Sequence, residues 1–165
     1  MVVLGIDPGS RIAGWGVVEE KGNTLKALGY GTIKTPTTIK ELPARLGHIF
    51  HEFESLIQKY SPDEIAVENV FFAENAKSAL VLGQARAAAI LPFVRVGLPV
   101  GEYTALQIKK ATTGQGRAEK SQVAKMVCRI LGIKETPKPA DITDALAIAI
   151  CHIHSAPFLK RATKV

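Results

Sequence analysis

The chain has 165 residues, carries a net charge of +6 at pH 7 and is 47% apolar, which suits one domain with a hydrophobic core and excludes a disordered chain. Its longest apolar runs are far shorter than the roughly 18 residues of a membrane-spanning helix, and its first residues lack the basic start and cleavage site of a signal peptide. The two cysteines, Cys128 and Cys151, form no CxxC motif, so the sequence predicts a reduced cytoplasmic protein without a disulfide framework or a zinc site.

The first part of the chain has the pattern of an antiparallel meander. Residues 2–6 form a short apolar run that ends in a turn sequence, which predicts a buried strand. Residues 12–18 and 24–34 predict two further strands, joined by a hairpin turn at 21–23. Three antiparallel strands are therefore expected before any helix.

Helices and strands then alternate. Apolar residues keep helical spacing over 42–57, and short strands are predicted at 64–67, running into Glu68, and at 98–104. A helix rich in small residues is expected over 73–94, with its end disturbed by Pro92. After a loop at 114–116, two more helices are predicted, at 123–131 and from 140 to about 154. This order predicts an α/β fold with one five-stranded mixed sheet flanked by helices, over residues 1–156, and a basic tail over 157–165.

Positive charge is concentrated in the second part of the chain. Residues 1–106 contain ten Lys or Arg and eleven Asp or Glu, whereas residues 107–165 contain eleven and four. Such a segment favours a polyanionic partner, of which nucleic acid is the commonest in the cytoplasm. The alternative is a basic surface with no specific partner.

Four carboxylates occur in apolar settings. Asp7 and Glu68 end predicted buried strands, and Asp141 and Asp144 lie three residues apart on one face of the last helix. Each has a simpler explanation alone: a turn former, a surface residue, a helix N-terminal acid or a solvated side chain. Together they suit Mg²⁺, because buried charges are costly unless paired or bound to metal, and Mg²⁺ prefers oxygen ligands.

Several short motifs, in order along nearly the whole chain, carry a family resemblance. They are Gly5-Ile6-Asp7-Pro8-Gly9-Ser10-Arg11, Gly14-Trp15-Gly16-Val17, Glu68-Asn69-Val70-Phe71, Gly83-Gln84-Ala85-Arg86, Ala118-Glu119-Lys120-Ser121-Gln122-Val123, and Ala140-Asp141 with Asp144 through Ala149. In these motifs the chain resembles the RuvC family of Holliday junction resolvases. The resemblance implies a ribonuclease H-like fold and a homodimer that cuts four-way DNA junctions by paired symmetric nicks, leaving 5′-phosphate and 3′-hydroxyl ends.

The resemblance also implies the site residues and partners. The expected catalytic residues and metal ligands are Asp7, Glu68, Asp141 and Asp144, which would hold Mg²⁺, or Mn²⁺ in its place, with two ions per site. Some family members have His at the position of Asp141, which leaves the relative weight of Asp141 and Asp144 open. The expected protein partner is the RuvA–RuvB branch-migration complex.

Seven residues are candidates for DNA contact. Phe71 is expected to stack on bases near the crossover, although packing on the core is the alternative. Lys109 and Lys120 are the strongest phosphate-binding candidates, because they lie in the basic segment and match the family pattern. Weaker candidates are Arg117, Arg11, Lys77 and Arg86. For each of these cations, a solvated surface position is the alternative.

Three other functions compete with this interpretation. An actin-like sugar kinase or ATPase also ends its first strand in an aspartate loop, but that fold needs two such domains. A related ribonuclease H-like nuclease acting on RNA is the second, and a non-catalytic junction-binding protein is the third. The presence of all four acids weighs against the last.

Overall fold

The computed structural model describes residues 1–69 and 75–162, with side-chain surroundings given as far as residue 155. β1 (Val2–Asp7), β2 (Ile12–Lys21) and β3 (Thr24–Lys34) form the predicted antiparallel meander. β4 (Glu64–Glu68) pairs in parallel with β1, and β5 (Val100–Tyr103) pairs in parallel with β4. The strand order β3-β2-β1-β4-β5 confirms a five-stranded mixed sheet.

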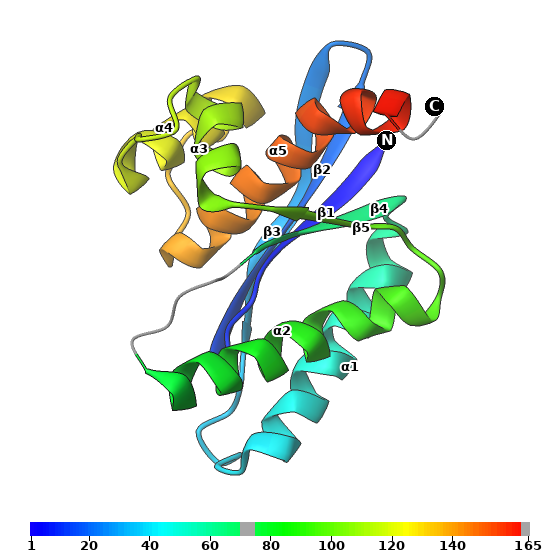
Figure 1. Cartoon of the computed structure of the whole chain (residues 1–165), viewed down its shortest axis with the longest axis vertical. Helices are drawn as coiled ribbons and strands as arrows, with labels where there is room; N and C mark the ends of the chain where they lie inside the picture. The colour runs from blue at the N-terminus through cyan, green and yellow to red at the C-terminus, as the bar shows by residue number, and fades with distance from the viewer. Residues whose placement is uncertain (70–74, 163–165) are drawn as a thin grey trace.

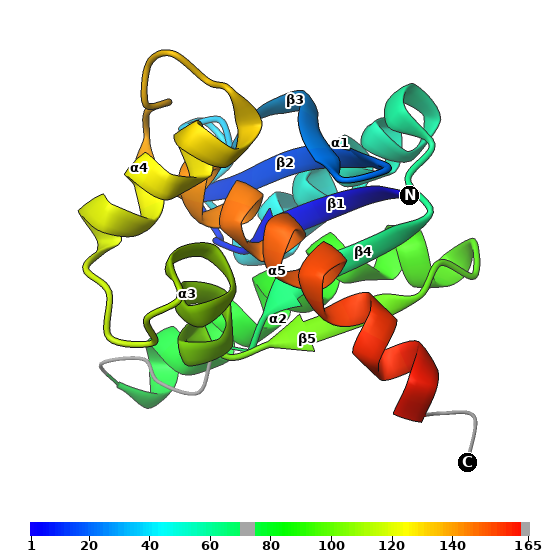
Figure 2. The ribbon, with the colours of Figure 1, turned by 90° about the horizontal axis from the view of Figure 1, so that it is seen from above.

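Helices cover both faces of this sheet. α1 (Leu42–Tyr60) and α2 (Ala76–Arg95) pack on one face, while α3 (Ala105–Thr113), α4 (Lys120–Leu131) and α5 (Ala140–Ala162) lie on the other (Figures 1 and 2). Among the described residues, no helix combines the length and apolar character needed to span a membrane.

Two helices differ from the prediction. α3 was not predicted, because its nine residues bury only two side chains, Ile108 and Thr112, and so show little periodicity. Thr104 and Gln107 form a capping box at its start, a signal that could have located it. The last helix was expected to end near residue 154 but continues to Ala162, and Pro157 does not end it.

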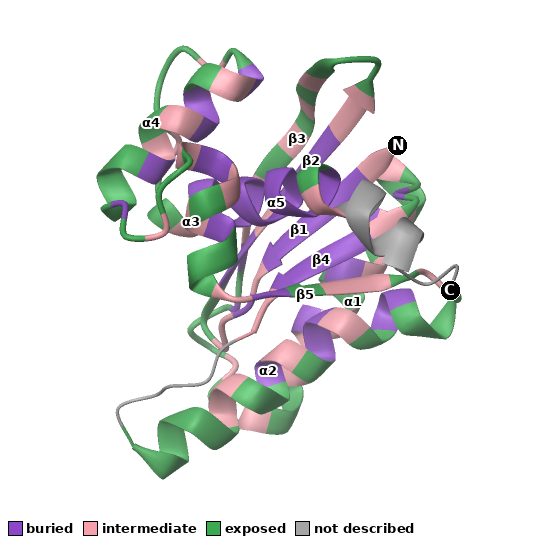
Figure 3. Ribbon diagram, turned by 45° about the horizontal axis from the view of Figure 1, so that its top comes forward, coloured by how far each residue is buried: buried purple, intermediate pink, exposed green. Residues whose placement is uncertain are grey.

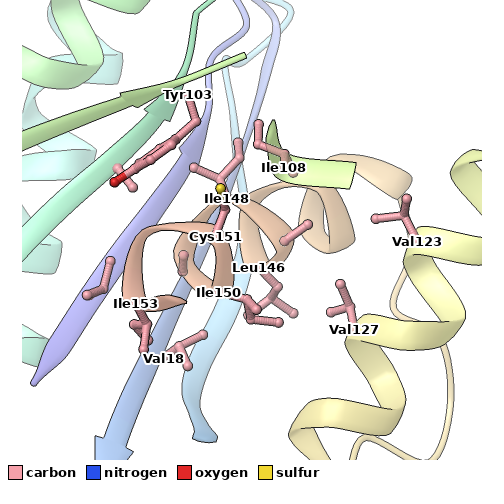
Figure 4. Close-up of a cluster of buried hydrophobic side chains, with 14 of the residues drawn as sticks. Val18, Tyr103, Ile108, Val123, Val127, Leu146, Ile148, Ile150, Cys151 and Ile153 are labelled. Atoms are coloured by element: carbon pink, nitrogen blue, oxygen red, sulfur yellow. The ribbon is translucent and has the colours of Figure 1, made fainter. Parts of the chain in front are cut away.

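Two hydrophobic clusters, one on each face, form the core. The first joins β1, β2 and β4 to α1 and α2 through residues such as Phe53 and Phe93. The second surrounds α5, whose residues 145–151 are all at most 1% exposed (Figures 3 and 4). α5 is covered by the sheet on one side and by α3 and α4 on the other, which explains why its sequence is apolar on most faces. Cys128 and Cys151 are both free and buried in the core.

Glycines let α5 lie directly on the backbone of the sheet. A Cβ atom added at Gly5 would lie 2.1 Å from the carbonyl oxygen of Ala145, and one at Gly14 would lie 2.0 Å from that of Asp141. Real Cβ atoms do not approach backbone this closely. The separation between α5 and strands β1 and β2 is therefore set by contact between main chains.

A buried polar network joins α5 to the parallel strands. Nδ1 of His152 lies 2.9 Å from the Tyr103 hydroxyl on β5, and Nε2 lies 2.6 Å from a carboxylate oxygen of Glu64 on β4. A neutral His152 with its proton on Nε2 satisfies both bonds. Because buried polar groups are costly when unpaired, this network favours one position of α5 along the sheet.

Candidate active site

The four predicted acids converge at one edge of the sheet. Asp7 and Glu68 are the last residues of β1 and β4, which are parallel neighbours, so both side chains occur at the carboxyl ends of adjacent strands. Asp141 and Asp144 occupy the first turns of α5, which crosses the same edge. Residues more than 130 positions apart in sequence are thus brought together.

Gly14 explains how α5 comes this close to Asp7. It is the partner of Asp7 in the β1–β2 register, and its missing side chain leaves room for the main chain and Cβ of Asp141. Any larger residue would displace the start of α5. Gly14 therefore allows Asp141 to lie close to Asp7, although the sequence motif that contains it gave no sign of this role.

Burial and neighbouring acids raise the pKa of Asp7 and of Glu68. Burial and the negative charges of Asp144, Asp141 and Glu68 raise the pKa of Asp7 to about 7, and only Lys120 opposes this. Burial and Asp144 likewise raise the pKa of Glu68, against the smaller influence of Lys120 and Lys109. Like charges held this close favour either protonation or a bound cation.

Lys120 partly offsets the negative charge of the acids. Its Nζ atom donates to a carboxylate oxygen of Asp144 at 3.1 Å, which together with the other acids raises the pKa of Lys120. A pocket lies between α3, α4 and α5, and its polar lining consists of Glu68, Lys109, Lys120 and Asp144. The two best phosphate-binding candidates therefore face two of the acids across one pocket.

Arg86, one of the weaker candidates for DNA contact, is bonded to residues of two strands. Its Nη2 atom forms an ion pair with Glu102 at 2.7 Å, and its Nε atom donates to the main-chain carbonyl oxygen of Glu68 at 3.3 Å. These contacts favour a role in holding the end of β4 over a direct contact with DNA. Sequence alone offered no signal for this pairing across three elements.

The remaining DNA candidates lie around the site. Arg11 is exposed on the β1–β2 connection, and Lys77 lies in the first turn of α2 beside Ser10 and Ser78. Arg117 is exposed between α3 and α4, without an ion pair among the described residues. Phe71 falls in residues 70–74, outside the described part of the chain.

The donor set fits a divalent cation by its chemistry. As they stand, no three His, Cys, Asp or Glu side chains among the described residues are close enough together to hold one metal ion. Asp144 is paired with Lys120 of α4 at 3.1 Å. However, all four acids offer hard oxygen ligands, and the raised pKa of Asp7 reflects burial together with nearby negative charge that a cation would neutralise.

A family model and sequence relatives identify the family of the chain. The family described as "Crossover junction endodeoxyribonuclease RuvC" matches residues 3–152. A protein of that name from Pelobacter propionicus is 54% identical over 155 residues, which cover 94% of this chain and 87% of the relative. Another from Desulfitobacterium hafniense is 48% identical over 161 residues, covering 98% of this chain and 97% of the relative.

Solved structures show the same fold. A structure of Thermus thermophilus RuvC superposes with a TM-score of 0.85 at 38% identity, covering 96% of each chain. T. thermophilus RuvC in complex with Holliday junction substrate gives a TM-score of 0.86 at 34% identity, with the same coverage. The yeast mitochondrial resolvase Ydc2, at 15% identity and a TM-score of 0.72, shares the fold. The ribonuclease H-like α/β fold is thereby confirmed.

Proposed function

The chain belongs to the RuvC family of crossover junction endodeoxyribonucleases and resolves Holliday junctions in DNA recombination and repair; from this premise we propose that Asp7, Glu68, Asp141 and Asp144 form its catalytic centre. The observation that carries this proposal is the convergence of four acids from β1, β4 and α5, with a pKa of about 7 at Asp7. Neither the RNA-directed nuclease nor the junction-binding protein without activity explains the family match as well.

The acids act as ligands for two divalent ions, Mg²⁺ or Mn²⁺. When bound, such ions activate a water molecule and stabilise the departing 3′ oxygen, which gives 5′-phosphate and 3′-hydroxyl ends. The carboxylates must be ionised for this role, so Asp7 has to lose its proton. Lys120 is paired with Asp144, and it would be available to a phosphate if Asp144 held a cation instead. Lys109 lines the same pocket and supports the same phosphate.

The working unit is a homodimer. A junction needs two opposed strands cut, and the four acids form a single site, so a two-fold dimer supplies the second site by the symmetry of the DNA. The outer face of α2 provides a surface, because Leu80, Leu91 and Val94 are each more than half exposed and follow helical spacing. Mixing wild-type chains with Asp7→Asn chains should give dimers that relax a supercoiled cruciform plasmid but rarely linearise it. Efficient linearisation by mixed dimers would contradict this.

The RuvA–RuvB branch-migration complex is the proposed protein partner, since junctions have to be delivered to the nuclease. Phe71 is proposed to stack on bases at the crossover, because it follows Glu68 closely in the sequence.

The activity and its metal requirement can be tested on a synthetic four-way junction. We expect paired nicks at symmetric positions with Mg²⁺ or Mn²⁺, and binding without cleavage in Ca²⁺, which is larger and accepts looser geometry. Full cleavage in excess EDTA would refute the metal mechanism. Cleavage of RNA duplexes at the same rate as junctions would refute the assignment of junction DNA as the substrate.

A further inference from the structure

A second basic surface lies on the side of Asp7 away from Lys120. A groove at the connection between β3 and α1 is lined by Arg11, Lys34, Thr35, Thr37 and Lys40. In Figure 1, α3 and α4 lie above the carboxyl end of β1, and the β3–α1 connection lies below it. The acids are therefore placed between two groups of cations.

The groove is held together by bonds between the two connections that form it. The main-chain N–H of Thr35 donates to the carbonyl oxygen of Arg11 at 3.0 Å, and the Thr35 hydroxyl donates to that of Ser10 at 3.3 Å. Nη1 of Arg11 donates to the carbonyl oxygen of Ile39 at 3.4 Å. The end of β3 at Lys34 and the loop that carries Lys40 are thus tied to the loop that follows Asp7.

Within residues 1–69 and 75–155, the cations of the groove have no acidic partner. Arg11, Lys34 and Lys40 are all exposed, and none forms an ion pair with a described residue. Thr37, also exposed, adds a hydroxyl donor to the lining. Three uncompensated positive charges and a hydroxyl around one depression suit a phosphate group.

The strand register places the groove within reach of the same DNA. Asp7 pairs with Gly14 and Gly14 with Thr32, so Lys34 lies two residues beyond this row and two strands away from Asp7. Strand spacing of about 4.8 Å and a rise of about 3.4 Å per residue put the two Cα atoms roughly 12 Å apart. A phosphate in the groove would belong to a nucleotide a few positions from the cut.

We propose that Arg11, Lys34 and Lys40 form a phosphate-binding subsite for the junction backbone, separate from the Lys109 and Lys120 pocket. This subsite rests on the proposed function above, and it assigns Lys34 and Lys40 a contact that neither the motifs nor the composition indicated. The scissile strand crosses the acids with a phosphate held on each side. Its position relative to the acids is then fixed at two points.

The test is junction binding by Lys34→Gln/Lys40→Gln as a function of salt, in Ca²⁺. Each lost phosphate contact should reduce the log–log salt slope by about 0.9, so the double variant should lose about one to two units of slope. Lys34→Arg/Lys40→Arg should retain the wild-type slope. The matched control, Lys26→Gln/Lys59→Gln, removes the same charge from exposed positions near the opposite ends of β3 and α1.

A scan of neutral methylphosphonates along the junction locates the contact. In the wild type, neutralising one phosphate a few nucleotides from the cut should weaken binding, and the same change should have no further effect in the double variant. Equal slopes for the double variant and the control pair, or unchanged methylphosphonate sensitivity in the double variant, would overturn the subsite. Failure of the wild type to cut junctions would instead overturn the proposed function.

Discussion

The carboxylate edge and the lysine-bearing surface are adjacent but built in different ways. Asp7, Asp141 and Asp144 are carried by β1 and α5, which are largely buried; α5 touches the backbone of β1 at Gly5 and that of β2 at Gly14. Lys120, in contrast, projects from the first turn of α4 with an exposed side chain. One region is positioned by packing, whereas the other acts through exposed charged side chains.

This difference predicts how each region should respond to substitution. A change at the carboxylate edge alters where or whether the acids meet, so it should affect cleavage steeply. A change among the lysines removes one of several phosphate interactions, so it should affect binding gradually and in a salt-dependent way.

The largest effect is expected from Asp7→Asn. Loss of this acid should reduce cleavage by orders of magnitude, while junction binding is kept or improved because negative charge near DNA is removed. Gel-shift affinity and nicking rate on the same junction measure both. Substantial residual cleavage would show that the carboxylate edge is not the site of catalysis.

Gly14→Ala should damage the site without touching an ionisable group. The new Cβ atom would meet the Asp141 carbonyl oxygen at 2.0 Å, so α5 must move, and overpacking of this kind costs about 1–3 kcal/mol. Urea unfolding and single-turnover cleavage should both show a loss. The control is Gly47→Ala on α1, where a Cβ atom meets nothing within 4 Å and a helical glycine is removed. Equal stability of the two variants would contradict the role of Gly14.

The pH dependence should follow the raised pKa of Asp7. In the metal-free folded protein Asp7 keeps its proton up to about pH 7, whereas in the unfolded chain it loses it near its ordinary value of 3.8. The folded state binds more protons between these values, so stability should fall as pH rises from about 4 to 7. Thermal unfolding in EDTA across this range measures the slope, which should be smaller in Asp7→Asn.

Metal binding should show the opposite trend. Ionised carboxylates are needed, so the stabilisation by Mg²⁺ and the cleavage rate at limiting Mg²⁺ should both increase from pH 6 to pH 8. Metal stabilisation that is independent of pH in this range would argue against Asp7 as a ligand.

The smallest effect is expected from Lys120→Ala on binding. Removing one phosphate contact should reduce the salt slope by about one unit and weaken binding most at low salt. Lys125→Ala, an exposed residue of the same helix that does not line the pocket, should leave the slope closer to that of the wild type. Similar slopes for the two variants would indicate that Lys120 acts only on Asp144.

The acids and the sheet were predictable because their signals are local. A buried strand that ends in an acid, or two acids three residues apart before an apolar helix, can be recognised within a few residues of sequence. α3 was not predicted because it buries too few side chains to show periodicity. The contacts of Arg86 with Glu68 and Glu102 depend on how α2, β4 and β5 meet, which no local pattern contains. The Lys120–Asp144 pair joins residues 24 positions apart and has the same origin.

The main-chain contact between α5 and the sheet also determines the order in which the protein should open. Amides of β1 and of residues 142–150 lie in the most buried part of the molecule and should exchange with solvent only on global unfolding, whereas α3, with two buried side chains, should open by local fluctuations. Heat or mild denaturant would then loosen the phosphate-binding side first. Under such conditions the acids would remain assembled in a protein that no longer holds its substrate.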